Sequence, residues 1–225
     1  RRQRQMCIRD SSNHRYNTAD YLRIDPLLGT EQDFITLCQR AHEHGIKIIL
    51  DGVFNHTGSD SLYFNKEGRY GPGGAYRDPR SPYRSWYCWK DAAANMYESW
   101  WGFQSLPKLN SRDESWREFL CGENGIVRHW LRLGADGWRL DVVDEYPDEL
   151  VRMIRQAARA EKPDALIIGE VWEDASCKEA YGEHRQYLMG HELDSVMNYP
   201  LRQAILDFLL LSLIHISEPT RQAEI

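Results

Sequence analysis

The stretch GADGWRLDVVDE (residues 134–145) carries an arginine and an aspartate inside an apolar pattern that predicts a buried strand. Side chains alternate along a strand, so Arg139 and Asp141 are predicted to share one face. A buried charge without a partner costs several kcal/mol. The pair is therefore either a structural ion pair or part of a polar site.

A second carboxylate, Glu170, lies late in the strand-like segment ALIIGEVW (165–172). Arg139 favours the ionised form of Asp141, whereas apolar neighbours and the lack of a nearby cation in sequence favour a protonated Glu170. An ionised and a protonated carboxyl group suit glycoside hydrolysis, as nucleophile and general acid/base. Retention of configuration needs the two groups about 5–5.5 Å apart, a distance that sequence spacing does not give.

Strands and helices alternate along the chain and would position these residues. Thr30 is predicted to cap an amphipathic helix, with Asp33 three residues on and Gly45 at its end. A helical stretch runs from Trp116 to Leu131, and about 50 irregular residues lie between Thr57 and Asn110. The other predicted elements are strands at 46–50, 135–143, 165–172 and 194–199, and helices at 147–160 and 201–210.

This alternation indicates an α/β fold with parallel strands, either an open doubly wound sheet or a (β/α)8 barrel. No G-x-G-x-x-G motif follows a strand, which weakens the dinucleotide-binding sheet. Polar residues instead follow the predicted strands, with Asp51, Asn55 and His56 after the first of them. In a barrel these strand ends form one rim, where the chemistry is found.

The composition disfavours several classes of binding partner. The formal net charge is −6 at pH 7, which disfavours nucleic acid, and no apolar run reaches the ~18 residues of a membrane span. Of the five cysteines, Cys7 lies near the N-terminal end, and Cys38, Cys88, Cys121 and Cys177 are scattered without C-x-x-C spacing, which argues against a zinc site or a disulfide framework. Aromatic residues cluster between 83 and 103 and suit either a surface that binds a flat-ring ligand or a core.

Five segments together resemble the α-amylase family of glycoside hydrolases. They are HRYNTADYLRIDP (14–26), DGVFNH (51–56), LPKLN (106–110), GWRLDVVDE (137–145) and GEVW (169–172), in the family's order. The lysine form of LPKLN, with DSVMNYP (194–200), is most similar to the neopullulanase, cyclomaltodextrinase and maltogenic amylase group. The resemblance implies an incomplete (β/α)8 TIM barrel, with strands 2–3 in residues 12–56, an inserted domain in 57–110 and strands 4–6 in 111–210.

The resemblance also assigns roles. Asp141 matches the nucleophile, Arg139 the arginine that orients it and Glu170 the general acid/base. The implied substrate-binding residues are His56, which hydrogen-bonds the sugar, Tyr16, which stacks on it, the nearby His14, and Asp144, Glu145 and Trp172 on the leaving-group side. Asp51 and Asn110 are expected to support the site, and Asn55 matches a calcium ligand of many relatives. Loop caps and packing residues are the ordinary alternatives for these polar and aromatic positions.

The implied function is that of a retaining α-glucan hydrolase acting on α-1,4 bonds, with α-1,6 bonds as a further target, in maltooligosaccharides, cyclodextrins, pullulan or starch. The chemistry needs no cofactor; calcium is a candidate structural ion. The alternatives are a non-catalytic sugar-binding relative, a 1,6-glucosidase and a glucosyltransferase. Asp144-Glu145 departs from the Asn-Glu common in the neopullulanase group, which leaves the subgroup open. A homodimer is compatible with the resemblance, and the location stays open, with the cytoplasm favoured.

The sequences at both ends of the chain do not fit the segments that adjoin them. Residues 1–11 include MCIRD and residues 211–225 begin LSLIHI, two segments that complementary DNA strands can encode. Both resemble a translated sequencing adapter, so we expect these tails to be non-native. Nothing after DSVMNYP matches the family's third acidic residue, an aspartate that follows a histidine, and the first, seventh and eighth strands have no match.

We therefore expect the 225-residue chain to be inactive and poorly soluble, because an incomplete barrel exposes strand edges. The measurement is release of reducing sugar from maltooligosaccharides and cyclodextrin by the purified chain. Turnover above that of a heat-denatured control would contradict the expectation.

Overall fold

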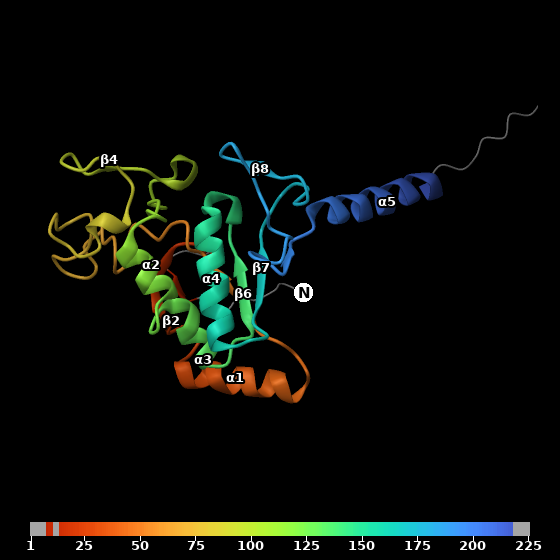
Figure 1. Ribbon diagram of the computed structural model, residues 1–225, viewed down its shortest axis with the longest axis horizontal. Helices are drawn as coiled ribbons and strands as arrows, with labels where there is room; N and C mark the ends of the chain where they lie inside the picture. The colour runs from red at the N-terminus through yellow and green to blue at the C-terminus, as the bar shows by residue number, and fades with distance from the viewer. Residues whose placement is uncertain (1–7, 11–13, 218–225) are drawn as a thin grey trace, which may run out of the picture.

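A four-stranded parallel sheet forms the centre of the computed structural model, which describes residues 8–10 and 14–217 (Figure 1). The strand order is β10–β7–β6–β3. The strands are β3 (Ile49–Gly52), β6 (Gly137–Leu140), β7 (Leu166–Gly169) and β10 (Ser195–Val196). Helices lie between β3 and β6 and between β6 and β7, whereas the segment from β7 to β10 holds a short hairpin. The predicted α/β fold with parallel strands is confirmed.

The register of the sheet brings the carboxyl ends of three strands together. Asp51 pairs with Arg139 between β3 and β6, and Leu140 pairs with Gly169 between β6 and β7. Strand β6 ends at Leu140, earlier than the sequence predicts, because Val142 has left-handed backbone angles (φ 43°). Asp141 thus stands in the turn that leaves the strand, beside its neighbours' last residues.

Four helices accompany the sheet, α1 (Glu31–Glu43), α2 (Glu114–Cys121), α3 (Ile126–Arg132) and α4 (Asp148–Glu161). The capping box predicted for α1 is present, since Thr30 and Asp33 each bond the other's backbone N–H. The stretch predicted as one helix from Trp116 to Leu131 is two helices. Helix α2 ends at Gly122, whose extended backbone (ψ 177°) cannot continue a helix.

Large aromatic side chains fill the space between the sheet and the helices. The ring of Trp138 lies 5.3 Å from that of Phe54, and the ring of Trp130 meets Phe34 edge-on at 5.3 Å between centroids. Much of the aromatic cluster at 83–103 also belongs to the core, since Trp86, Tyr87 and Tyr97 are buried and Tyr83 and Trp89 pack against them. Trp101, 66% exposed, is an exception. The aromatic cluster therefore mainly packs in the core, and some of its rings lie at the surface.

The segment from Thr57 to Asn110 is mostly irregular, as predicted. Its short elements are η1 (Arg84–Trp86), β4 (Trp89–Asp91), β5 (Met96–Tyr97) and η2 (Trp100–Gly102). A bridge between His56 and Lys108 ties the end of the segment to the chain that follows β3. This contact brings the LPKLN segment to the strand ends.

Strand β2 (Thr18–Ile24) pairs with β1 (Ile8–Asp10) in an antiparallel ladder and is not in the four-stranded sheet. The expected second strand of a barrel is thus present as a strand but differently paired. Its carbonyls at Thr18 and Ala19 accept the N–H groups of Gly58 and Leu62. Those bonds attach β2 to the irregular segment.

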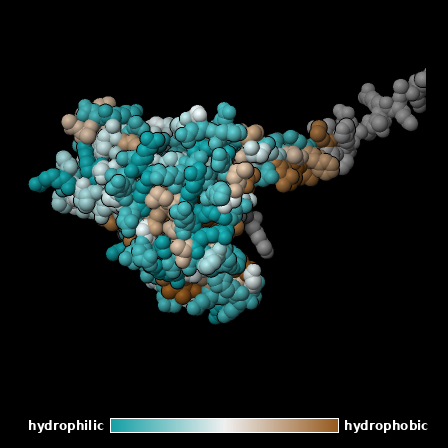
Figure 2. Space-filling view, in the orientation of Figure 1, coloured by the Kyte–Doolittle hydropathy of each residue, from teal (hydrophilic) through white to brown (hydrophobic). Residues whose placement is uncertain are grey.

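The last helix, α5 (Tyr199–Ser217), projects away from the body of the molecule (Figure 1). Its apolar residues between Leu201 and Leu211 are exposed, as the brown surface in Figure 2 shows. No helix among the described residues is long and apolar enough to span a membrane. The tails expected to be non-native overlap β1 and the end of α5, while residues 1–7, 11 and 218–225 of those tails lie outside the described residues. Their origin stays a prediction.

Gly137 offers a test of the strand packing that builds the site. A β-carbon at Gly137 would collide with the carbonyl oxygen of Leu166 on β7, whereas one at Gly73 would meet open space. We expect Gly137→Ala to lower the free energy of unfolding by about 1–3 kcal/mol in urea denaturation. Gly73→Ala is the control and should change it by less than about 0.5 kcal/mol. Equal effects would contradict this packing.

Candidate active site

Three carboxylates and one arginine meet at the carboxyl ends of β3, β6 and β7. Asp51 and Arg139 face each other in register. Asp141 and Glu170 each follow directly after the last residue of a strand, and the Glu170 N–H donates to the carbonyl of Leu140 at 3.0 Å. The sheet therefore places these side chains beside one another, as the strand-end pattern predicts.

Arg139 contacts all three carboxylates. Its Nη1 lies 2.6 Å from Asp51 Oδ1 and 2.7 Å from Asp141 Oδ1, and its Nη2 lies 3.0 Å from Glu170 Oε2. Each of the four side chains is at most 15% exposed. Burial lowers the pKa of Arg139, but the three carboxylates outweigh it and raise that pKa above its ordinary value. The single positive charge of Arg139 is thus shared among three carboxylates.

Burial raises the pKa of Asp141 to about 7. Arg139 lowers this pKa, while repulsion from Asp51 and Glu170 raises it further. Burial also raises the pKa of Asp51, against the opposing effect of Arg139. Arg139 thus favours the ionised form of Asp141, as predicted, but its charge is shared among three carboxylates and does not offset the burial of Asp141.

Glu170 shows the opposite shift. Burial raises its pKa, but hydrogen bonds to the carboxylate from Val142, Trp172 and Tyr199, together with the charge of Arg139, bring it below the ordinary value. The Val142 N–H donates to Glu170 Oε2 at 3.0 Å. The prediction of a protonated Glu170 in an apolar place is thus wrong here. Val142 and Tyr199 lie 28 and 29 positions from Glu170 in sequence, so the chain order did not reveal these two donors.

The turn after β6 is held by Tyr146. Its hydroxyl donates to the carbonyl of Asp141 at 2.8 Å and accepts the N–H of Phe54 at 3.1 Å. The left-handed Val142 turns its N–H toward Glu170. Backbone strain of this kind costs about 1–3 kcal/mol and persists only where the surroundings enforce it. Here Tyr146 and Glu170 supply that enforcement.

His56 lies four residues beyond the end of β3, beneath Trp100. The two rings stack with 5.4 Å between centroids, and His56 is 1% exposed. Burial lowers the pKa of His56 to about 4, partly opposed by the backbone of Tyr16. His56 is therefore neutral near pH 7 and can donate or accept one hydrogen bond at each ring nitrogen.

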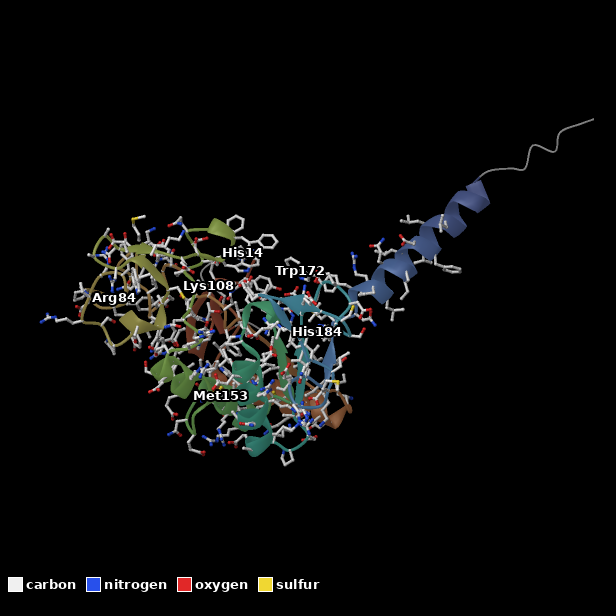
Figure 3. The ribbon with its side chains drawn as sticks, turned by 45° about the horizontal axis from the view of Figure 1, so that its top comes forward. His14, Arg84, Lys108, Met153, Trp172 and His184 are labelled. Atoms are coloured by element: carbon white, nitrogen blue, oxygen red, sulfur yellow. The ribbon has the colours of Figure 1, made fainter. Side chains whose placement is uncertain are left out.

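His14 and Tyr16 reach the same region from the chain before β2. Their rings stack with 6.2 Å between centroids, and the Tyr16 N–H donates to His14 Nδ1 at 3.2 Å. Both residues influence the pKa of His56. The structure thus brings the three predicted sugar-contacting residues His14, Tyr16 and His56 together. In the view of Figure 3, His14, Lys108 and Trp172 lie on the same side of the ribbon.

A cleft of about 210 Å³ opens beside Glu170. We call it the leaving-group cleft; its lining consists of Trp100, Trp101, Val142, Asp144, Glu145, Glu170, Trp172, Glu173 and Lys178. One wall is aromatic, because Trp100 stacks on Trp101 and Trp101 meets Trp172 edge-on at 5.5 Å between centroids. The other wall is charged. All three residues predicted for the leaving-group side line this cleft.

Sequence reasoning missed the partners of the charged wall. Lys108 Nζ lies 2.9 Å from Glu145 Oε2, and Lys178 Nζ lies 3.2 Å from Asp144 Oδ2. The Tyr181 hydroxyl also donates to Glu145, at 2.5 Å. Lys108 belongs to the LPKLN motif, which could have indicated its place at the site. Lys178 and Tyr181 lie in a segment without a recognised motif.

Asn110 and Asn55 have more local contacts. The Asn110 side chain donates to the Ser85 carbonyl at 3.4 Å and accepts the Arg112 N–H at 3.2 Å, so it braces its own loop. The Asn55 amide faces His56 Nδ1 at 3.3 Å. Within residues 14–211, no group of three or more His, Cys, Asp or Glu side chains is placed to hold a metal ion. Calcium at Asn55 stays a prediction, and no step is derived through it.

Comparison with known proteins gives one consistent result. The model of the alpha amylase catalytic domain matches residues 8–215. An amylopullulanase of Thermoanaerobacterium saccharolyticum is 44% identical over 218 residues, which cover 88% of this chain and 16% of that protein. Neopullulanase 2 of Thermoactinomyces vulgaris is 37% identical over 210 residues, which cover 91% of this chain and 33% of that protein.

A solved structure of a cyclomaltodextrinase superposes with a TM-score of 0.75 at 32% identity, covering 91% of this chain and 33% of that one. The chain therefore spans about a third or less of the length of these relatives. The amylopullulanase match broadens the group that the sequence motifs indicated.

The raised pKa of Asp141 predicts a pH-dependent stability. A carboxyl group whose pKa is higher in the folded than in the unfolded state stabilises the fold at low pH, and this contribution is lost as the pH rises through about 7. Asparagine cannot ionise. We therefore expect the free energy of unfolding of Asp141→Asn, relative to the unsubstituted protein, to increase as the pH rises from about 4 to about 8.

Urea unfolding at several pH values measures this difference. Asp207→Asn, at an exposed position of α5, is the control and should follow the unsubstituted protein across the range. A difference for Asp141→Asn that stays constant with pH would contradict the raised pKa.

Proposed function

The chain belongs to the α-amylase family of glycoside hydrolases, and from this premise we propose that the protein carrying it is a retaining α-glucan hydrolase. The observation that carries the proposal is the cluster of Asp51, Asp141 and Glu170 around Arg139. One guanidinium holding both Asp141 and Glu170 supports the short separation of carboxyl groups that retaining enzymes use.

The architecture is proposed to be part of a (β/α)8 barrel. The family's catalytic domain implies such a barrel, and β3, β6, β7 and β10 occur in consecutive order, as strands 3–6 of a barrel would. Strand β2 is assigned to barrel strand 2 and residues 57–110 to the inserted domain. The strand ends that carry Arg139 then form the rim on which barrel enzymes place their chemistry.

We assign Asp141 the role of nucleophile and Glu170 that of general acid/base. In the first step Asp141 attacks the anomeric carbon, and Glu170 gives its proton to the departing glycosidic oxygen; in the second step Glu170 takes a proton from water, which displaces Asp141. The two carboxyl groups and Arg139 titrate as one coupled set. In this structure the proton favours Asp141, so the reaction needs it to move to Glu170.

Substrate binding supplies a physical reason for that transfer. A sugar that fills the cleft removes water from Glu170 and brings an ether oxygen against it, and both changes favour the protonated acid. Asp141 then carries the negative charge, held beside Arg139. This carboxylate stabilises the positive charge that develops on the sugar. The protein groups supply both proton transfer and nucleophile, so the proposed chemistry requires no cofactor.

The remaining predicted residues are assigned to the sugar. Tyr16 offers a ring for stacking, and neutral His56 can hydrogen-bond a hydroxyl once Trp100 moves off its face. Asp144, Glu145 and Trp172 line the leaving-group cleft. The names of the relatives, amylopullulanase, neopullulanase and cyclomaltodextrinase, favour α-1,4 bonds of pullulan, cyclodextrins and maltooligosaccharides as targets, with α-1,6 bonds as a further one.

The test uses the complete protein that carries this sequence. We expect it to hydrolyse pullulan or cyclodextrin and to release products first as the α-anomer, seen by NMR. Asp141→Asn and Glu170→Gln should each lower kcat at least about a thousandfold while the circular dichroism spectrum is unchanged.

Asp207→Asn, on the exposed surface of α5, serves as the matched control for removal of one carboxylate. Initial release of the β-anomer would refute retention. Substantial turnover by Asp141→Asn would remove Asp141 from the role of nucleophile.

A further inference from the structure

Strained backbone gathers around the leaving-group cleft. Six described residues other than glycine have positive φ, namely Arg15, Asn65, Asn95, Trp101, Val142 and Tyr181. Asparagine adopts these angles readily, but bulky and β-branched residues do not. Trp101 and Val142 line the cleft, and Tyr181 bonds Glu145, which also lines it. Strain of about 1–3 kcal/mol per residue marks places where position matters more than stability.

Tyr181 stands at the tip of a short hairpin. Strands β8 (Glu179–Ala180) and β9 (Glu183–His184) are joined by Tyr181 and Gly182, with φ of 55° and 79°. Two positive φ values in a two-residue loop define a type I′ turn, whose first position favours Asn, Asp or Gly. A tyrosine is therefore costly at this position, and the turn directs it toward the charged wall of the cleft.

The polar end of Tyr181 is fixed and its ring is free. The hydroxyl donates to Glu145 Oε2 at 2.5 Å, and Lys108 Nζ, itself paired with Glu145, lies 5.8 Å from the ring centroid. Burial and the charge of Glu145 raise the pKa of Tyr181 to about 12, so the hydroxyl stays a donor. The residue is nevertheless 71% exposed. An anchored ring with an open apolar face suits stacking on a sugar.

The base of the hairpin is anchored as well. Lys178 pairs with Asp144 at 3.2 Å and with Glu173, and its side chain is 15% exposed. Tyr187, after the hairpin, donates to the same Asp144 at 2.7 Å. Asp144 and Glu145 belong to η3 (Val143–Glu145), which follows β6. The hairpin is thus fastened to the turn that carries the leaving-group residues.

We propose that Tyr181 binds a glucosyl unit on the leaving-group side, beyond the unit held in the cleft, and thereby sets a preference for long over short α-glucans. The cleft volume of about 210 Å³ is below the ~300–1,000 Å³ typical of ligand pockets, so a longer chain must continue over its rim. Tyr181 offers an exposed ring there. This inference rests on the proposed function and concerns specificity, since Tyr181 contacts none of the reacting atoms.

The test compares kcat/KM for amylose and for maltotriose in the complete protein and its variants. We expect Tyr181→Ala to lower the ratio of the two values about tenfold, through a higher KM for amylose. Tyr181→Phe keeps the ring and should retain most of the ratio. Met189→Ala is the matched control, because Met189 is 70% exposed in the same segment and lies outside the cleft lining.

Each outcome decides the inference. A selective loss on amylose that Tyr181→Phe restores supports a stacking role. Equal losses on both substrates, an unchanged ratio, or a Tyr181→Phe variant as poor as Tyr181→Ala would overturn it and leave the proposed function standing. Absence of hydrolysis by the unsubstituted protein would overturn the proposed function, and this inference with it.

Discussion

Arg139 places one positive charge among three buried carboxylates, and the arrangement of the strand ends depends on that contact. Removing one partner of a buried ion pair costs about 3–5 kcal/mol, because a charge is left without compensation. The three carboxylates therefore cannot be placed in this site without the arginine. The opposite face of the same strand presents Trp138 and Leu140 to the core. The four-residue strand β6 thus packs against the apolar core on one face and presents Arg139 to the carboxylates on the other.

Sharing one cation has a chemical consequence. Arg139 cannot fully stabilise every carboxylate at once, so burial raises the pKa of Asp141 while the Val142 N–H and its neighbours lower that of Glu170. The two groups form one coupled system, in which the proton favours Asp141. A substrate must therefore supply the bias that places the proton on Glu170. Strain at Val142 is part of this balance, since its turned N–H is a donor to Glu170.

Local patterns predicted much of the structure. The cap at Thr30, the buried face of α4 with Leu150 and Ile154, and the Arg139–Asp141 pair follow from residue spacing alone. The sequence did not reveal that β6 stops at Leu140 or that Glu170 loses its predicted proton, because both depend on contacts between distant segments. The anchoring of Tyr181 by Glu145 was missed for the same reason, as 36 positions separate them.

The most direct test of the shared cation is the pH dependence of kcat/KM in the complete protein that carries this sequence, with Arg139→Lys measured beside the unsubstituted form. Lysine keeps the charge but cannot contact three carboxylates with a planar fork. Both limbs of the bell-shaped profile should move to higher pH, because Asp141 and Glu170 each lose stabilisation of their ionised forms. A profile that only falls in height, with both limbs unmoved, would contradict the central role of Arg139.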